Sequence, residues 1–336
     1  MSKPTMQNLA DAVGVSRITV WKALSGRPGV SDEVRRSVQQ KAAELGYGSP
    51  PPPPSSVPRE QTFSVVVSRP ESSVFWMQII HHIAKELARS GISLMYTYMP
   101  TAWHEGYALP ASLSPGSVDG FIVLNVYNER LLGMLSASPL PKVFLDTVPE
   151  MQPSRLGGDL VLLEGRTRTR AITGRLLAGE RRRLGFIGDV GYAQTNLDRY
   201  EGFLDAHRAL SLAPDPSLSL TGPLTIGSHY EQISRFLDRL PALPDGIVCA
   251  SDFIAHFVSR YLSESGRAAP DSIILTGFDD NPEYANVAQR ITTVHVDTSS
   301  LGRLLARKLM FRADCPEAPP EVSYIATELL FRGPLA

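Results

Sequence analysis

The sequence predicts a small all-α unit with helix-turn-helix geometry, followed by a large α/β core of two lobes. Three helix-start signals within residues 1–48 predict the first part. Beyond residue 62, short β-branched apolar runs alternate with longer helical stretches, which is the pattern of parallel sheets covered by helices. About 275 residues exceed one comfortable sheet domain, so we expect two lobes there. A run of prolines separates the two parts.

Composition and charge limit the classes of protein that the chain can belong to. Its 336 residues are 43% hydrophobic and 20% charged, which fits a globular protein and excludes a collagen, a disordered tail or a disulfide miniprotein. Because the net charge is −1, any nucleic-acid surface must be local, and residues 1–48 carry seven basic and four acidic side chains. Cys249 and Cys315 are the only cysteines, and the start resembles no signal peptide. With no apolar run near 18 residues, we expect a cytoplasmic protein without a membrane partner.

Three capped helices are predicted in the first 48 residues. Thr5 precedes MQNLADAV, Ser16 precedes RITVWKAL, and Ser31 precedes DEVRRSVQQKAAELGY. Ser and Thr at these positions accept hydrogen bonds from the first free N–H groups of a helix. Gly14 stands in the short turn between the first two helices, which predicts helix-turn-helix geometry.

The second of these helices carries side chains that can read DNA bases. Helical spacing places Val20, Ala23 and Leu24 on an inward side. The opposite side carries Arg17, Ile18, Trp21, Lys22 and Ser25. Arg and Lys can donate to guanine in the major groove, and an aliphatic side chain can contact a thymine methyl group. The alternative is a solvated amphipathic helix in a packing domain, but three capped helices, a net positive charge and a spacer together favour DNA binding.

A proline-rich linker is predicted at residues 49–61. The segment GSPPPPPSSVPREQ at 48–61 contains five consecutive prolines at 50–54, and Pro58 follows. Such a run favours the polyproline II conformation and excludes the interior of a helix. We therefore expect a semi-rigid spacer between the two parts of the chain.

Polar side chains follow several of the predicted strands in the core. The apolar runs are FSVVV (63–67), GFIVL (120–124), KVFL (142–145), LGFIG (184–188), GIVCA (246–250) and SIILTG (272–277). Open α/β sheets bind ligands beyond the carboxyl ends of their strands. The polar residues that follow these strands are Asn125, Asp146, Ser251, Asp252 and Asp279. Their carboxylate, amide and hydroxyl groups can bind the hydroxyl or amine groups of a ligand. An Asp at such a position can alternatively be a helix cap. Arg199, at a helix start, offers five donors to such a ligand.

These segments resemble a known family. The stretch TMQNLADAVGVSRITVWKALSGRPGVSDEVRRSVQQKAAELGY is similar to the DNA-binding headpiece of the LacI/GalR family of bacterial transcription regulators. Further similar segments follow in family order: VDGFIVLN (118–125), RYEGFLDA (199–206), CASDFIA (249–255), LTGFDD (275–280), ITTVHVDTSSLGRLLARKLM (291–310) and ELLFRG (328–333). The resemblance implies a two-lobed core of the periplasmic-binding-protein type I fold. It places lobe 1 at about 62–160 and 292–325, and lobe 2 at about 161–291 and 326–336, with the headpiece at 1–48.

The resemblance also implies roles for individual residues. Arg17, Ile18 and Lys22 would read bases, while the hydroxyl residues would donate to phosphates or cap helices; these are Thr5, Ser16, Thr19 and Ser31. Trp21 stands where a small residue is usual, and Ser25 where an asparagine is common. In the core, Arg199 and Asp279 would be the principal ligand anchors, and Phe75 and Trp76 would supply aromatic contacts. The family places a hinge helix near Val57, where the prolines predict a spacer instead.

The expected function is a ligand-responsive repressor that binds double-stranded operator DNA as a homodimer. Its effector would be a sugar or a related polar metabolite bound between the lobes. A solute-binding protein without a DNA function is the alternative, and an enzyme is disfavoured because the sequence contains no Walker A, GxGxxG, GxSxG or HExxH motif. No cofactor is expected. His81 and His82 lack a Cys or Asp at metal-ligand spacing, so no metal is expected either.

Overall fold

The structure, a computed structural model, describes residues 5–24, 29–45, 47, 61–68, 73–179, 183–267 and 272–336. The chain folds into two compact units, Met1–Arg59 and Glu60–Ala336. Ser25, Val57 and the predicted linker, apart from Gln61, lie outside the described residues.

The first unit contains the three predicted helices, α1 (Met6–Val13), α2 (Arg17–Leu24) and α3 (Asp32–Leu45). Each begins with a hydroxyl side chain that accepts a backbone N–H: Thr5 from Asn8, Ser16 from Thr19, and Ser31 from Val34. The predicted caps are therefore confirmed. The φ of Gly14 is 72°, a left-handed conformation that lets the chain turn from α1 into α2.

A small apolar core holds the three helices together. Leu9 and Ala10 of α1, Val20 and Ala23 of α2, and Val38 and Ala42 of α3 pack against one another. Leu24 was expected to face this core, but it is exposed because it is the last residue of α2.

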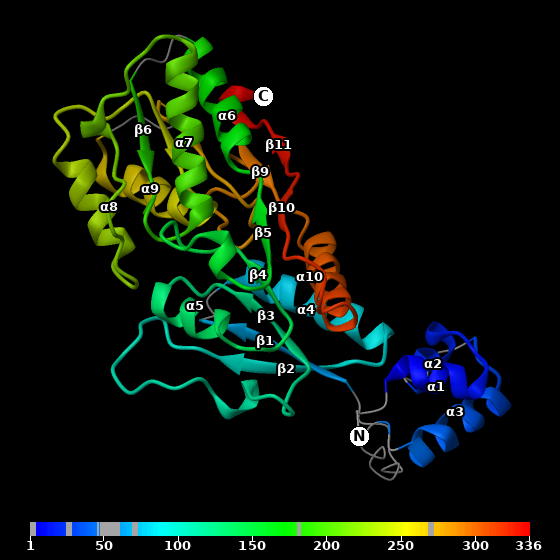
Figure 1. The fold of residues 1–336 in the computed structure, drawn as a ribbon. Coiled ribbons are helices and arrows are strands. Elements are labelled where there is room, and N and C mark those ends of the chain that lie inside the picture. Colours follow the sequence, from blue (N-terminus) through cyan, green and yellow to red (C-terminus); the bar gives the residue numbers. More distant parts are fainter. Residues whose placement is uncertain are drawn as a thin grey trace. The chain divides into compact units, whose positions relative to one another are not determined.

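The first lobe of the core is built on a six-stranded parallel sheet in the order β10-β5-β4-β3-β1-β2. Its strands are β1 (Thr62–Val67), β2 (Ser93–Tyr98), β3 (Gly120–Leu124), β4 (Lys142–Leu145), β5 (Asp159–Leu163) and β10 (Val322–Ile325). Helix α4 (Val74–Arg89) packs against α10 (Thr298–Asp314) on one side of the sheet, and α5 (Glu129–Ser136) lies on the other (Figure 1). The strands β1, β3 and β4 are buried on both faces, which explains their continuous apolar runs.

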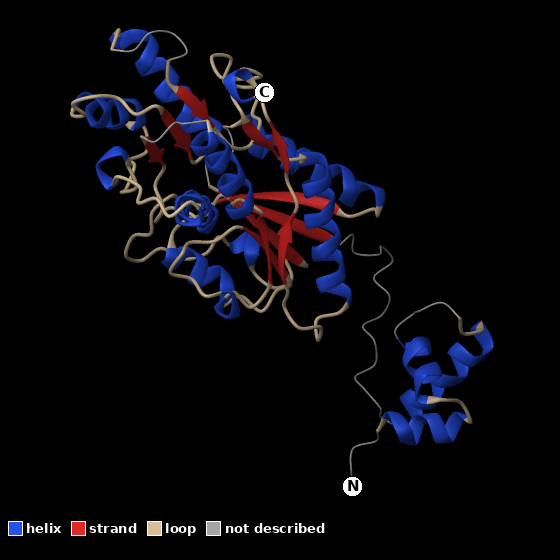
Figure 2. Cartoon of the chain, turned by 90° about the horizontal axis from the view of Figure 1, so that it is seen from above, coloured by secondary structure: helices blue, strands red, loops and turns tan. Residues whose placement is uncertain are grey.

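The second lobe is built on a shorter parallel sheet in the order β6-β7-β8. Its strands are β6 (Leu184–Ile187), β7 (Gly246–Cys249) and β8 (Ile274–Thr276). Its helices are α6 (Arg166–Ala178), α7 (Gln194–Ala209), α8 (His229–Asp238) and α9 (Asp252–Ser265). Helices cover the strands of both lobes, as Figure 2 shows. This arrangement confirms the predicted α/β core.

Two antiparallel strands, β9 (Thr293–His295) and β11 (Glu328–Leu330), connect the sheets of the two lobes. The chain passes from β5 in the first sheet to α6 and β6, and returns through β9 to α10. After β10 at the edge of the first sheet, it leaves again through β11 (Figure 1). The end of the chain then meets α6, where Arg175 Nε donates to Leu335 O at 3.0 Å.

The helices α6 and α7 approach each other closely because of a glycine. A Cβ atom added at Gly202 of α7 would lie 2.2 Å from Arg166 O and 3.1 Å from Arg170 N. Both are backbone atoms of α6, which cannot move aside as a side chain can. Gly174 of α6, in contrast, has no atom within 4 Å of an added Cβ.

We predict that Gly202→Ala destabilises the core by about 1 to 3 kcal/mol, because the new methyl group forces the two helices apart. The matched variant Gly174→Ala should be neutral or should stabilise by up to about 1 kcal/mol, since alanine is the better helix former. Urea unfolding of both variants measures these differences. Equal stability of the two variants would contradict the close approach of α6 and α7.

Candidate functional site

The outward side of α2 is one candidate site. Arg17, Ile18 and Trp21 are exposed, whereas Thr19 and Lys22 are half-buried. Five of the eight residues predicted to meet DNA therefore lie on this one helix of the first unit. The other three, Thr5, Ser16 and Ser31, are the helix caps described above.

Helix α2 is fixed at both of its ends. Ser16 Oγ accepts the N–H of Thr19 at 3.1 Å at the start of the helix. At the end of the helix, Arg35 Nη1 of α3 donates to Ala23 O at 3.2 Å. Because Val20 and Ala23 are fully buried, the helix cannot rotate without disrupting the apolar core of the unit. The exposed side chains of α2 are therefore held in one orientation.

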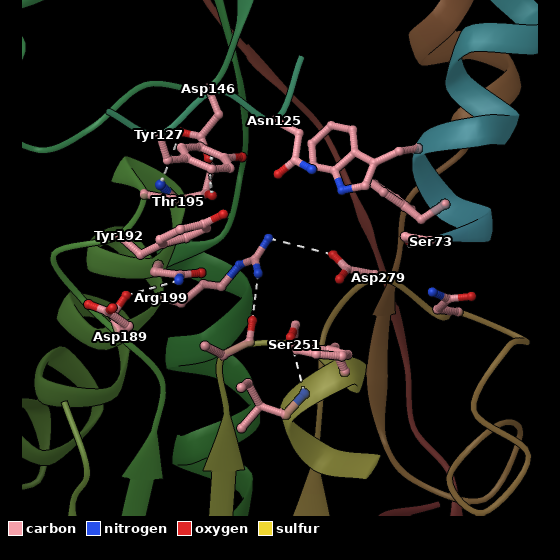
Figure 3. A pocket seen from close by; sticks show the side chains of 18 of the residues that line it. Ser73, Asn125, Tyr127, Asp146, Asp189, Tyr192, Thr195, Arg199, Ser251 and Asp279 are labelled. Carbon is pink, nitrogen blue, oxygen red and sulfur yellow. Dashed lines mark hydrogen bonds and ion pairs between the residues drawn. The ribbon is translucent and has the colours of Figure 1, made fainter. Parts of the chain in front are cut away.

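The second candidate site is a cavity of about 260 Å³ between the two lobes of the core. Seven of the eight residues predicted to bind a ligand line it: Phe75, Trp76, Asn125, Asp146, Arg199, Ser251 and Asp279. Phe75 and Trp76 come from the start of α4, and their rings meet edge to face at 5.3 Å. Figure 3 shows Arg199 reaching between Tyr192 and Asp279 in this cavity.

Three of the polar residues at strand ends have an unusual backbone. The φ angles of Asn125, Asp146 and Asp279 are 53°, 68° and 104°, and each residue follows a strand that ends at the cavity. Positive φ is unfavourable for residues other than glycine, but Asn and Asp tolerate it best. Such strain is retained where a site requires it. The sharp turn at the strand end brings the three side chains to the cavity wall.

Three contacts hold the side chain of Arg199, which belongs to α7, at the cavity. Its guanidinium group is buried and donates from Nη1 to Ala250 O at 2.5 Å, at the end of β7. Nη2 lies 3.7 Å from Asp279 Oδ1, and the guanidinium carbon lies 3.6 Å from the centre of the Phe278 ring. Nε is buried and has no hydrogen-bond partner among the described residues. The side chain therefore presents donors to the cavity from a fixed position.

Asp279 lies in an environment that disfavours its charge. Burial raises the pKa of Asp279 to about 7, the Arg199 guanidinium opposes this rise, and the nearby Asp252 carboxylate adds to it. At neutral pH the carboxyl group can consequently accept a hydrogen bond from a ligand or donate one.

Asp146 joins the two lobes. Its Oδ2 accepts from Thr195 Oγ1 at 2.5 Å and from Tyr127 OH at 3.2 Å, while Oδ1 accepts from Thr147 N at 2.8 Å. Asp146 follows β4 of the first lobe, and Thr195 stands in the first turn of α7 in the second. Gln194 N also donates to Thr147 O at 2.7 Å. Burial raises the pKa of the Asp146 carboxyl group, although these hydrogen bonds oppose the rise.

Asp252 is not among the residues that line the cavity. Its carboxylate is engaged within the protein, where Oδ1 accepts from Thr293 Oγ1 at 2.8 Å and Oδ2 accepts from Asn281 N at 2.9 Å. Burial raises the pKa of Asp252 to about 6. The neighbouring Ser251 does line the cavity, and it also caps α9 by accepting from Ile254 N at 3.3 Å.

Several lining residues were not predicted from the sequence. They are aromatic or polar side chains in the loops and helix starts around the cavity: Ser73, Tyr127, Asp189, Tyr192, Thr195, Asn196, His229, Phe253, Asn281 and Tyr284. Tyr127 of the first lobe contacts Tyr192 of the second, with ring centres 4.6 Å apart. Tyr127 and Asp189 closely follow β3 and β6, which is a signal that the sequence contains, whereas His229 and Tyr284 lie far from any strand end and only the fold brings them to the cavity.

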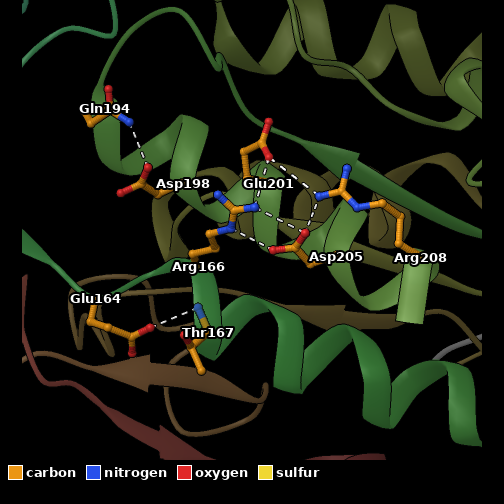
Figure 4. A network of polar contacts seen from close by, with 8 residues as sticks. All are labelled: Glu164, Arg166, Thr167, Gln194, Asp198, Glu201, Asp205 and Arg208. Carbon is orange, nitrogen blue, oxygen red and sulfur yellow. Dashed lines mark hydrogen bonds and ion pairs between the residues drawn. The ribbon is translucent and has the colours of Figure 1, made fainter. Parts of the chain in front are cut away.

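A network of charged residues supports α7, the helix that carries Arg199. Arg166 at the start of α6 binds Asp205 of α7, with Nε 2.7 Å from Oδ2, and also lies 3.4 Å from Glu201 (Figure 4). Arg208 joins the same two carboxylates. Hydrogen bonds from both arginines lower the pKa of Asp205 to about 2, so the Asp205 carboxylate stays charged at physiological pH.

None of the described helices combines the length and the apolar character that a membrane span requires. No group of three or more His, Cys, Asp or Glu residues in the described part of the chain is arranged to hold a metal ion.

Both units of the chain match known protein families. Residues 5–49 match the family described as bacterial regulatory proteins, lacI family, and residues 173–333 match the periplasmic binding protein-like domain. The HTH-type transcriptional regulator CelR of Thermobifida fusca is 28% identical over 340 residues, which cover 98% of both chains. The HTH-type transcriptional repressor PurR of Haemophilus influenzae strain PittEE is 26% identical over 322 residues, covering 92% of this chain and 90% of the relative.

Solved structures agree with these relatives. A complex of the transcriptional regulator CelR with cellobiose superposes with a TM-score of 0.69 at 26% identity, over 98% of this chain and 99% of the other. The lac repressor dimer bound to operator and the anti-inducer ONPF has the same fold, with a TM-score of 0.66 at 19% identity and 98% coverage of both chains. With a lacI-type helix-turn-helix unit, a periplasmic-binding-protein-like core and regulators as its full-length relatives, the chain has the domain organisation of LacI-family bacterial regulatory proteins.

Proposed function

We propose that this protein is a repressor that binds a pseudopalindromic operator as a homodimer and responds to a small polar effector in the cavity. In this proposal residues 1–48 are the DNA-binding headpiece, residues 49–61 are a linker, and residues 62–336 bind the effector and dimerise. The observation that carries it is the combination, in one chain, of an outward basic helix and a lined cavity between two lobes.

The headpiece supports sequence-specific binding to the major groove. Arg17 stands in the first turn of the rigidly held α2, and Lys22 stands one and a half turns later. Both are donors of the kind that recognise guanine, whereas the hydroxyl groups at the helix caps can meet the backbone phosphates. The net charge of +3 in residues 1–48 favours a polyanionic partner.

An exposed apolar surface on the first lobe supports dimerisation of the core. Val74 and Met77 of α4 are exposed, and so are Tyr96 and Tyr98 of the neighbouring β2. Helix α4 packs against β2, so these side chains belong to one side of the lobe. Exposed apolar groups gathered in this way are typical of surfaces that bind another protein. We assign this surface to the second copy of the chain.

The cavity supports a sugar or a similar polar effector. Its walls combine hydrogen-bonding side chains such as Asn125, Arg199 and Asp279 with aromatic rings such as Trp76 and Tyr192. Aromatic faces pack on the C–H groups of a sugar ring, while the polar groups fix its hydroxyls. The CelR relative was solved with cellobiose bound, and a LacI-family regulator from Enterococcus faecium was solved with bound ribose.

We predict that Arg17→Ala relaxes the choice of base at one position of each half-site and costs about 1 to 3 kcal/mol of binding. Lys41→Ala removes a half-buried cation of α3 that pairs with Glu44; it is the control and should keep the preference of the wild type. Fluorescence anisotropy with cognate and scrambled operators measures both variants at several salt concentrations. An unchanged ratio of cognate to scrambled affinity in Arg17→Ala would refute the assignment of Arg17.

For the effector site, we predict that calorimetric titration detects binding of cellobiose or ribose to the wild-type protein. Asp279→Ala should weaken that binding about tenfold, because leaving a buried hydrogen-bonding group without its partner costs about 1 to 3 kcal/mol. Asp314→Ala, an exposed change at the end of α10, is the control and should bind like the wild type. Binding of neither sugar would argue against a sugar effector.

The raised pKa of Asp279 predicts a dependence of stability on pH. Between the pKa of an unfolded Asp, about 3.9, and the folded value of about 7, the folded protein holds a proton that the unfolded chain has lost. Stability therefore falls as the pH rises through this range. Between pH 5 and pH 8, the free energy of unfolding of the wild type should fall by about 2.5 kcal/mol more than that of Asp279→Asn.

Urea unfolding at the two pH values checks this prediction. Asp314→Asn should follow the wild type, because Asp314 is exposed. Parallel pH profiles for the wild type and Asp279→Asn would show that Asp279 is already charged at pH 5.

A further inference from the structure

Two large apolar side chains stand next to each other on the outward side of α2. Ile18 is 68% exposed and Trp21 is 48% exposed. Their separation of three residues places them on neighbouring turns of the same face. Arg17 precedes the pair and Lys22 follows it, so the apolar surface lies between two cationic groups.

The core of the headpiece explains why this pair cannot turn inward. Val20 and Ala23, on the opposite side of α2, are fully buried against α1 and α3. The hydrogen bonds of Ser16 and Arg35 hold the two ends of the helix. Burial of Trp21 would require the exposure of Val20, and the headpiece therefore presents an indole ring to its surroundings.

The charge of the headpiece indicates what this apolar pair meets. Residues 1–48 carry a net charge of +3, which attracts DNA and opposes close approach of a second headpiece. In the major groove the edges of the bases are polar, with a single apolar group, the C5-methyl group of thymine. An apolar pair set between two base-reading donors is complementary to that methyl group.

We propose that Ile18 and Trp21 together form a reading surface for the C5-methyl group of thymine in each operator half-site. Trp21 is then a specificity-determining residue, which adds to the hydrogen-bonding contacts of Arg17 and Lys22. The proposal rests on the proposed function, because it requires sequence-specific binding to duplex DNA. The proposal requires that each operator half-site contain at least one thymine beside the bases that Arg17 and Lys22 read.

The test removes the methyl group from the DNA and leaves every hydrogen-bonding group in place. The full-length protein first selects its operator from random duplex DNA. Each thymine of the selected half-site is then replaced by deoxyuridine, one position at a time. Affinities for the two forms are measured with the wild type, Ile18→Ala and Trp21→Ala.

At one thymine position or more, deoxyuridine should weaken binding of the wild type about fourfold, which corresponds to one buried methyl-sized group. The ratio of the affinity for thymine-containing DNA to the affinity for deoxyuridine-containing DNA should fall to about one in Ile18→Ala and in Trp21→Ala. Leu45→Ala is the control and should keep the effect of deoxyuridine seen with the wild type. Leu45 is also an exposed apolar residue, but it lies at the end of α3.

The possible results separate this proposal from the one on which it rests. Selection of no preferred sequence would refute sequence-specific binding, and the reading surface with it. A preferred sequence without any effect of deoxyuridine on the wild type would refute the reading surface alone, and this measurement needs no folded variant. A deoxyuridine effect that persists in Trp21→Ala would remove Trp21 from the surface.

Discussion

The buried guanidinium group of Arg199 is the constraint on which the core depends. A charge removed from water must be compensated, and the compensation here comes from three directions: Ala250 O at the end of β7, the Asp279 carboxyl group and the ring of Phe278. These groups follow the second and third strands of the second sheet, whereas Arg199 itself belongs to α7. The salt-bridge network at Arg166 and the close contact at Gly202 keep α7 where the guanidinium group can be satisfied. Displacement of α7 would leave a buried charge unpaired, so the geometry of the cavity and the packing of the second lobe are maintained together.

The contacts that cross the cavity are mainly polar. Asp146 accepts from Thr195, Gln194 N donates to Thr147 O, and on the other side of the cavity Val74 N donates to Glu283 Oε2 at 3.0 Å. Each of these bonds contributes only about 0.5 to 1.5 kcal/mol net, because water can replace it when the lobes separate. Two apolar clusters lie within single lobes and would stay intact during such a movement, whereas a third cluster contains side chains of both lobes. A ligand that adds a few hydrogen bonds across the cavity can therefore change the balance between separated and joined lobes.

Much of this organisation could be predicted from the sequence. The caps at Thr5, Ser16 and Ser31 and the buried strands from GFIVL to SIILTG carry strong local signals, and the fold class follows from them. The strands β2, β5 and β10 were not singled out. Strand β2 is an edge strand with exposed Tyr96 and Tyr98, which gives a weaker apolar pattern. The polar groups at strand ends were also accessible to prediction, because a parallel sheet aligns them. Tyr192, His229 and Tyr284 could not be predicted as cavity residues, because their approach to the cavity depends on loop paths that no local sequence pattern determines. The bonds that engage Asp252 likewise depend on Thr293, which is 41 residues away in the chain.

The position of β10 in the first sheet has a consequence for synthesis of the protein on the ribosome. This edge strand and the covering helix α10 come from residues 298–325, whereas the remaining five strands of the sheet are complete at residue 163. The whole sheet of the second lobe is translated between these two points. The first lobe therefore stays incomplete while the second lobe can already fold. During this time the surfaces of the sheet and of α4 that α10 later covers are exposed to solvent. Formation of the first lobe is a late, long-range event, and the nascent chain most needs protection from aggregation during that interval.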